Sequence, residues 1–527
     1  MEQGLLVIVA LGTTVIVGTT IGRRYSVAPP VLLIVMGGLL ALIPQLSDVR
    51  LPPEAVLVIF LPGILYWESL NTSLREIRAN IRVILLSAIG LVIATMAALS
   101  YSLQALGVAA GAAWILGAVL APTDAAAVVG LAKRMPRRNL TTLRAESLIN
   151  DGTALVLFAV AVGAVVTGSV PSKLAITGDL IWSVVGGVIA GVVSGGLVIW
   201  IRRRLDDPLR GGGLSIVTPF GAFFLGELIH ASGVVAVVVT GLVITYAGPR
   251  VIRAPSRVQA FAFWSLATFI VNGSLFVLVG LQVTAAAKRI ENGQTARAVG
   301  IAFAAAAVVI ATRIVWLHFM ALVIRTFDRR AIQRTRRLNW KVRTAYGWAG
   351  FRGAVSLAAA LAVPSVLDNG DPYPDRDLIV FVTSVVILTT ILVQGLTLPM
   401  VVRWAGLAND TARADEARHA RVRAAEAGLA ALPAVARSLD APAQMTDRVR
   451  ADYEAAASEA RGSSGESGMT SAEQLERRLR LGVLEHERLA VIAMRDRREI
   501  DDIVMRELEA ALDVTELGLL GPADNDG

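Results

Sequence analysis

The feature that most constrains this chain is a long series of apolar stretches, each of about 18 residues or more. A helix of that length matches the hydrocarbon thickness of a bilayer. Lipid offers no hydrogen bonds to the backbone, so a spanning segment must satisfy its own polar groups, as a helix does. The mean hydropathy of +0.62 agrees with lipid as the main solvent. The sequence therefore predicts an all-α polytopic membrane protein with about 13 transmembrane helices. The predicted spans are 4–21, 29–46, 54–70, 83–101, 109–132, 142–168, 178–201, 212–230, 232–247, 258–284, 298–324, 344–364 and 377–403.

Basic residues gather in alternate loops between these spans. Arginines follow the odd-numbered spans, and the other loops are poor in bases apart from Lys288 and Arg289. By the positive-inside rule the arginine-rich loops are cytoplasmic, which places the N-terminus outside and the C-terminus inside a multi-pass cell-membrane protein. The same distribution accounts for the pI near 10.1, so no nucleic-acid partner is expected.

The composition changes after Arg403. We expect a transmembrane domain over residues 1–403 and a helical cytoplasmic tail over residues 404–527, which is rich in Ala, Arg and Glu. A Gly/Ser-rich linker at 462–468 divides the tail. Ser471 followed by Gln474 resembles a capping box at the start of a helix, and the segment from there to about Leu519 has helical periodicity. A regulatory or self-associating tail and a passive solvated appendage are equally compatible with this pattern.

Ionisable residues inside the predicted spans are the main indication of function, because a charge at the bilayer centre is costly and usually functional. If each of the two arginines pairs with one glutamate, three acids remain without a counter-charge. Those acids must hold a proton, a cation, or each in turn, and alternation between the two is antiport chemistry. Our hypothesis pairs Glu146 with Arg352 and Glu227 with Arg313. The residues in question are Glu68, Asp124, Glu146, Asp151, Glu227, Arg313 and Arg352.

The densest polar group lies at residues 146–151. On a helix, Ser147 and Asp151 share one face, and Glu146 and Asn150 share the adjacent face. Ser147 then adds a hydroxyl oxygen beside the Asp151 carboxylate, and hard monovalent cations prefer several oxygen ligands. A polar stripe that only packs helices together is the alternative interpretation.

Two other spans contain breaks. Pro122 removes a backbone donor in the middle of its span and frees carbonyls near Asp124. Gly350 and Gly353 flank Arg352 seven spans later. Because an odd offset reverses the direction of the helix, we expect inverted repeats with two broken helices that cross at the site.

Several functional classes are disfavoured by the sequence. There is no Walker A loop, Rossmann glycine fingerprint, hydrolase serine motif or metal-ligand histidine spacing, so ion gradients rather than ATP should drive transport. No cofactor is expected. A potassium-selective antiporter, a channel or uniporter, and a membrane enzyme remain as alternatives, although the enzyme lacks a nucleophile–base pair.

Taken in order, these motifs resemble those of the monovalent cation:proton antiporters, in the branch of the bacterial NhaP-type and animal NHE-type sodium/proton exchangers. The resemblance covers about residues 5–403. It is carried by Ala121–Asp124, Glu146–Asp151, Gly226–Glu227 with Ser232–Val238, and Phe351–Ser356. One departure is Ala125, where the family has proline after Thr-Asp, while this chain has Pro122 instead.

The resemblance implies an NhaA-like antiporter fold, a homodimer and a six-helix core that moves as an elevator. It also implies roles for individual residues. Asp151 would bind the ion or the proton in competition, with Ser147 and the Thr123 carbonyl as direct cation ligands. Glu68 and Asp124 would act near the ion, Asn150 would organise the site, and Glu146 with Arg352 would form a structural ion pair. The implied activity is electroneutral exchange of Na⁺ for H⁺, with Li⁺ or K⁺ as alternative cations.

Overall fold

The computed structural model describes residues 2–25, 29–47, 56–72, 74–124, 137–168, 173–205, 207–289, 294–327, 339–364, 366–367, 371, 373, 375–407, 412–462, 471–497, 499 and 502–520. Over these residues the regular secondary structure is entirely helical. The chain divides into two compact units, residues 1–409 and residues 410–527. The first unit therefore ends shortly after the predicted boundary at 403.

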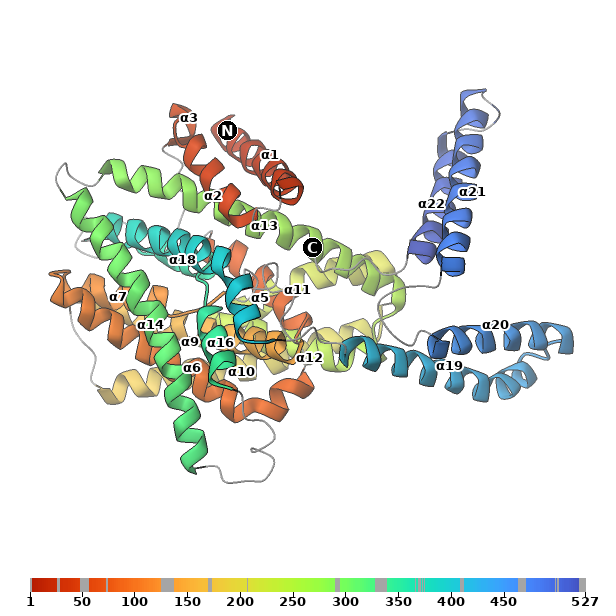
Figure 1. The fold of residues 1–527 in the computed structure, drawn as a ribbon, viewed down its shortest axis with the longest axis horizontal. Helices are drawn as coiled ribbons and strands as arrows, with labels where there is room; N and C mark the ends of the chain where they lie inside the picture. The colour runs from red at the N-terminus through yellow and green to blue at the C-terminus, as the bar shows by residue number, and fades with distance from the viewer. Residues whose placement is uncertain are drawn as a thin grey trace. The chain divides into compact units, whose positions relative to one another are not determined.

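The helices of the first unit follow the predicted spans (Figure 1). Among the described residues, nine helices are long and apolar enough to cross a membrane, and three further apolar helices are shorter. Each of the 13 predicted spans corresponds to a helix or a pair of helices. They are α1 (Glu2–Tyr25), α2 (Pro29–Leu40), α3 (Pro44–Ser47), η1 (Val56–Phe60), α5 (Leu61–Leu70), α6 (Leu74–Ala105), α7 (Ala110–Leu120), α9 (Arg137–Val166), α10 (Lys173–Arg202), α11 (Pro208–Leu228), α12 (Gly233–Ala247), η2 (Gly248–Arg250), α13 (Ala254–Arg289), α14 (Thr295–Phe327), α16 (Trp340–Trp348), α17 (Ala354–Leu361) and α18 (Arg376–Trp404).

The breaks between neighbouring helices have local causes. The division between α11 and α12 is a turn in which His230 has a φ of 52°, and the Ser232 side chain caps α12 by accepting from the Val235 amide. The span predicted at 344–364 consists of α16 and α17 with a non-helical segment between them, as the glycines at 350 and 353 predict. The second half of the predicted span 109–132, together with Ala125, lies outside the described residues.

Helices α2 and α13 cross with their backbones in direct contact, and glycine makes this possible. A Cβ at Gly37 would lie 2.0 Å from the Val277 carbonyl oxygen, and one at Gly280 would lie 2.0 Å from that of Ile34. Small residues at such crossings are typical of membrane helices, where close backbone approach supplies the packing energy.

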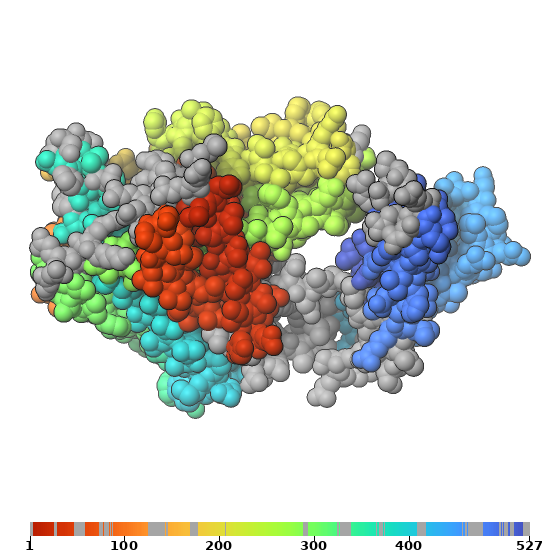
Figure 2. Space-filling view, turned by 90° about the horizontal axis from the view of Figure 1, so that it is seen from above, coloured from red at the N-terminus to blue at the C-terminus, as the bar shows by residue number. Residues whose placement is uncertain are grey.

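The helices nearest the N-terminus expose apolar side chains. Leu5, Ile8 and Ile16 of α1 are each more than half exposed. The red surface of this region is visible in Figure 2, beside the green surface of later helices. Such a surface suits contact with lipid or with another apolar helix rather than with water.

The second unit contains four helices, which form two antiparallel pairs, α19 with α20 and α21 with α22. Helix α21 begins at Ser471, as the capping box predicts. The segment to about Leu519, which has helical periodicity in the sequence, consists of two helices, of which the first ends at Asp496 and the second begins at Asp502. The linker residues 463–468 lie outside the described part. The bounds are α19 (Ala412–Ser438), α20 (Ala443–Gly462), α21 (Ser471–Asp496) and α22 (Asp502–Leu520).

Candidate ion-binding site at two broken helices

The two predicted breaks lie against each other. Helix α7 ends at Leu120, and residues 121–124 continue as non-helical chain. Helices α16 and α17 are separated by residues 349–353. The amide of Asp124 donates a hydrogen bond of 2.9 Å to the Phe351 carbonyl, so the two non-helical segments are joined through their backbones. This contact joins parts of the chain more than 200 residues apart, as an inverted repeat with crossing breaks predicts.

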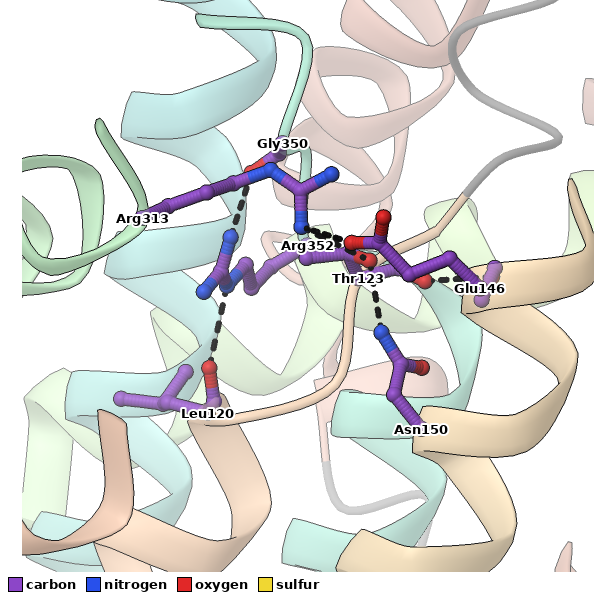
Figure 3. Close-up of polar contacts among 8 residues, drawn as sticks. Leu120, Thr123, Glu146, Asn150, Arg313, Gly350 and Arg352 are labelled. Carbon is purple, nitrogen blue, oxygen red and sulfur yellow. Dashed lines mark hydrogen bonds and ion pairs between the residues drawn. The ribbon is translucent and has the colours of Figure 1, made fainter. Parts of the chain in front are cut away.

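Charged side chains match the polarity of the helix ends at this crossing. Asp124 Oδ2 lies 3.4 Å from the Ala354 amide, at the positive N-terminal end of α17. Arg352 donates from Nε to the Leu120 carbonyl (3.0 Å) and from Nη1 to the Gly350 carbonyl (2.5 Å). Figure 3 shows the Arg352 guanidinium between these two carbonyls, the first on the last residue of α7 and the second in the break that follows α16. The arginine thus neutralises the partly negative end of α7 and also satisfies a free carbonyl of the second break.

Helix α9 is held to the α7 break through Thr123. Ser147 Oγ donates to the Thr123 carbonyl at 2.5 Å. Asn150 Nδ2 donates to the Thr123 hydroxyl at 2.8 Å, as Figure 3 shows. All three residues are buried. Ser147 and Asn150, predicted to lie on adjacent faces of the helix, are three residues apart, about one turn, so both reach the same threonine. Ser147 retains its oxygen lone pairs while donating, so the bond leaves it able to bind a cation.

The predicted pairing of Glu146 with Arg352 is wrong. Glu146 Oε1 lies 2.9 Å from Arg313 Nη1, and the two side chains are 6% and 2% exposed. The contact is an ion pair by distance, although its angle is not that of a hydrogen bond. Arg313 also donates to the Thr123 hydroxyl at 3.4 Å. Arg352 is engaged instead by main-chain carbonyls, and that is the physical reason it does not take Glu146.

The predicted pairing of Glu227 with Arg313 is also wrong. Glu227 lies in the exposed last turn of α11, where its Oε1 accepts a hydrogen bond of 3.2 Å from the Gly233 amide. It therefore caps the start of α12 rather than joining the buried charges. Arg313 lies in the middle of α14, which brings it to Glu146.

A small cavity of about 10 Å³ lies beside the crossing. A volume of this size holds about one water-sized species. Three carboxylates from three separate segments line it: Glu68 of α5, Asp124 of the α7 break and Asp151 of α9. No arginine is among the described residues that line it. The remaining lining residues are Ile64, Pro122, Thr123, Asn272, Gly353, Ala354, Val355 and Ser356.

Asp151 is the most enclosed of the three acids. It is 3% exposed, and its Oδ1 has no hydrogen-bond partner among the described residues. A buried carboxylate oxygen without a donor costs free energy unless a proton or a cation satisfies it. The three acids do not by themselves form a metal cluster of His, Cys, Asp or Glu within the described residues. A cation there would also need hydroxyl, carbonyl or water oxygens.

The structure brings most of the predicted site residues together. Asp151, Thr123, Asp124 and Glu68 line one cavity, while Ser147 and Asn150 contact it through Thr123. Sequence reasoning assigned no role at the site to Asn272 and Ser356, which also line the cavity. Asn272 is the polar residue of an otherwise apolar stretch in α13, and that contrast was the available indication.

Comparisons with known proteins agree with this geometry. The family model for the sodium/hydrogen exchanger transmembrane region matches residues 11–404. An uncharacterized Na⁺/H⁺ exchanger of Mycobacterium tuberculosis is 54% identical over 526 residues, 99% of this chain and 97% of the relative. The Na⁺/H⁺ antiporter ApNhaP of Aphanothece halophytica is 33% identical over 422 residues, 78% of this chain and 76% of the relative.

The fold also matches a solved structure. The sodium proton antiporter MjNhaP1 from Methanocaldococcus jannaschii superposes with a TM-score of 0.58, covering 77% of this chain and 98% of that chain at 18% identity. At that identity the match shows the antiporter fold, and the family model and sequence relatives show membership. The chain therefore belongs to the transmembrane sodium/hydrogen exchanger family of cation/proton antiporters.

Proposed function

We propose that the chain exchanges one monovalent cation, preferably Na⁺, for one proton, and that Asp151 binds either of them but never both. The observation that carries this proposal is the single water-sized cavity lined by Glu68, Asp124 and Asp151. Three ionised carboxylates around so small a space repel one another unless a positive species lies between them. A proton and a cation both meet that need, and the cavity has room for about one.

The proposed cation ligands are the Asp151 carboxylate, the Ser147 hydroxyl and the Thr123 carbonyl. The Ser147–Thr123 hydrogen bond supports this set, because it holds two neutral oxygens next to the acid. Glu68 and Asp124 would act through water. Asn150, the neighbour of Asp151, donates to Thr123 and carries no charge. In the proposed cycle, Asp151 is therefore the one carboxylate of this pair of positions that binds a cation or a proton. Exchange of one positive charge for another then moves no net charge, which makes the cycle electroneutral.

The proposed orientation follows the distribution of bases, with the N-terminus outside and the tail in the cytoplasm. The basic loops at 133–138 and 325–343 lie for the most part outside the described residues. The exposed apolar side chains of α1 are consistent with the proposed homodimer as well as with lipid.

Transport by proteoliposomes containing a pH-sensitive dye tests the proposal. A Na⁺ gradient should move protons in the wild-type protein, and Asp151→Asn should abolish that movement. Asp179→Asn is the matched control, because Asp179 is an exposed acid of α10 remote from the cavity lining. Normal exchange by Asp151→Asn would show that the carboxylate is not the shared site.

Two further measurements test whether Na⁺ and protons compete for one site and whether they exchange one for one. With protons and Na⁺ on the same side, lowering the pH should raise the apparent KM for Na⁺ in proportion to the proton concentration, without lowering the maximal rate. Clamping the membrane potential at different values should leave the rate unchanged. A potential-dependent rate would contradict the one-for-one cycle, and cation flux that ignores the pH gradient would indicate a channel. Repeating the assay with Li⁺ and K⁺ identifies the preferred cation.

A further inference from the structure

A second cavity lies where α10 ends and α12 passes through η2 toward α13. Its volume is about 360 Å³, within the range of roughly 300–1,000 Å³ that is typical of ligand pockets. Among the described residues, the lining consists of four arginines and two apolar residues and contains no acid. We call it the arginine pocket; it is lined by Arg202, Arg203, Leu205, Arg250, Val251 and Arg253.

Arg202 distinguishes this pocket from an ordinary basic loop. Exposed arginines are solvated and need no partner, but Arg202 is only 6% exposed. Its Nε is buried without a hydrogen-bond partner, and no carboxylate of the described residues forms an ion pair with it. A buried, uncompensated charge is destabilising, so an anion in the pocket would offset a cost that the described side chains leave in place.

Helix capping does not account for Arg202. Its neighbour Arg204 fills that role for α10, since Nη1 donates to the Trp200 carbonyl at 3.3 Å while the guanidinium stacks 3.9 Å over the Trp200 ring. Arg204 is not among the lining residues of the pocket. The two arginines are two positions apart, and only one of them has a local partner for its charge.

The pocket lies at the level where a membrane meets water. Trp200 is 53% exposed at the end of α10, and Tyr246 is 57% exposed in the last turns of α12. Exposed Trp and Tyr at the ends of spanning helices are typical of the lipid headgroup region. Basic pockets at this depth bind anionic headgroups, and a guanidinium fits a phosphate through paired hydrogen bonds.

We propose that the arginine pocket binds a phosphate group, supplied by the headgroup of an anionic phospholipid. The apolar Leu205 and Val251 then lie against the beginning of the lipid's apolar part. A zwitterionic choline lipid carries the same phosphate, but four guanidinium groups repel its choline cation. The inference concerns binding at the membrane surface and is independent of the transport cycle.

The test uses the purified full-length protein in detergent micelles with added phosphatidylglycerol or phosphatidylcholine of identical acyl chains. Retained lipid is measured by native mass spectrometry, and thermal unfolding by tryptophan fluorescence. We expect about tenfold greater retention of phosphatidylglycerol and a higher Tm in its presence. Arg202→Gln should remove the preference. Because a buried substitution could prevent folding, the double variant Arg250→Gln/Arg253→Gln, at the exposed rim, tests the same point.

The matched control is Arg204→Gln/Arg257→Gln. It removes the same charge from two exposed arginines nearby in the sequence, Arg204 just after α10 and Arg257 in the first turn of α13, neither of which is among the lining residues named above. The control should keep the preference for phosphatidylglycerol. Equal retention of the two lipids by the wild-type protein, or equal loss in both double variants, would overturn the proposal. Inorganic phosphate, compared with chloride at matched ionic strength, separates the two sources. Stabilisation by phosphate that exceeds that by lipid assigns the pocket to a soluble anion and contradicts the lipid assignment.

Discussion

The ion pair between Glu146 and Arg313 makes a quantitative prediction, because both groups are almost fully buried. Two unit charges about 4 Å apart attract by about 4 kcal/mol at an effective dielectric constant of 20. Removing one partner also leaves the other charge uncompensated, which costs about 3–5 kcal/mol in comparable buried pairs. Removing both partners avoids that second cost. We therefore expect Glu146→Gln and Arg313→Gln to be strongly non-additive, with a coupling energy of roughly 2–4 kcal/mol.

The double-mutant cycle is measured by equilibrium unfolding in mixed micelles of a mild and a denaturing detergent, followed by tryptophan fluorescence. Glutamine is close in size to both residues, so the cycle isolates charge more than volume. A parallel cycle with Glu146→Gln and Arg352→Gln is the control, and its coupling should be smaller, since Arg352 binds the carbonyls of Leu120 and Gly350.

Additivity within about 0.5 kcal/mol for Glu146 and Arg313 would refute the pairing, since that is the scatter between independent sites. A coupling energy between Glu146 and Arg352 that exceeds the one between Glu146 and Arg313 would support the pairing that the resemblance implies. If Arg313→Gln does not fold, Arg313→Lys serves in its place. It keeps the charge but loses the planar fork, and so should retain most of the coupling.

Three further substitutions test the crossing and the packing around it. Gly353→Ala should abolish transport and lower the Tm, because its Cβ would lie 1.7 Å from Asp124 Oδ2; Gly300→Ala, where nothing lies within 4 Å, should change neither. Gly280→Ala should destabilise the protein by about 1–3 kcal/mol in the same unfolding assay through overpacking against α2, whereas Gly38→Ala, whose Cβ would find its nearest neighbour at 3.7 Å, should have little effect. Asp124→Asn should cost about 0.3–1 kcal/mol of stability, because it keeps an oxygen near the Ala354 amide but loses the charge that favours the α17 N-terminus. An unchanged proton flux in Gly353→Ala, or an equal loss in both members of a glycine pair, would contradict the close contacts.

The helical architecture could be read from the sequence because lipid imposes a strong constraint. An apolar run in a membrane has few structural options, so in the described part of the chain each predicted span contains one helix or two. The two breaks were predictable for a similar reason, since Pro122 removes a donor and Gly350 and Gly353 interrupt a span. The meeting of Asp151 with the Pro122 break also followed from the pattern of motifs.

The partners of the arginines could not be read in the same way. Counting charges gives the number of pairs but not their geometry, and pairing depends on where each helix places its side chain. Arg352 lies in a break, where free carbonyls compete for it, whereas Arg313 lies within the intact helix α14 and has no such carbonyls to bind. The capping role of Glu227 could not be predicted either, because it depends on the exact residue at which α11 ends.

Thr123 has a consequence for how access to the cavity can alternate. Its carbonyl and hydroxyl are fixed by Ser147 and Asn150, while the next residue, Asp124, is joined through its amide to Phe351. The oxygens beside Asp151 thus belong to a cross-linked frame of three helical segments, and distorting that frame would break several buried hydrogen bonds at once. Opening the cavity toward either aqueous side therefore costs less free energy if the three segments move together and keep these hydrogen bonds. Affinity for the ion and exposure of the ion are then governed by different parts of the molecule.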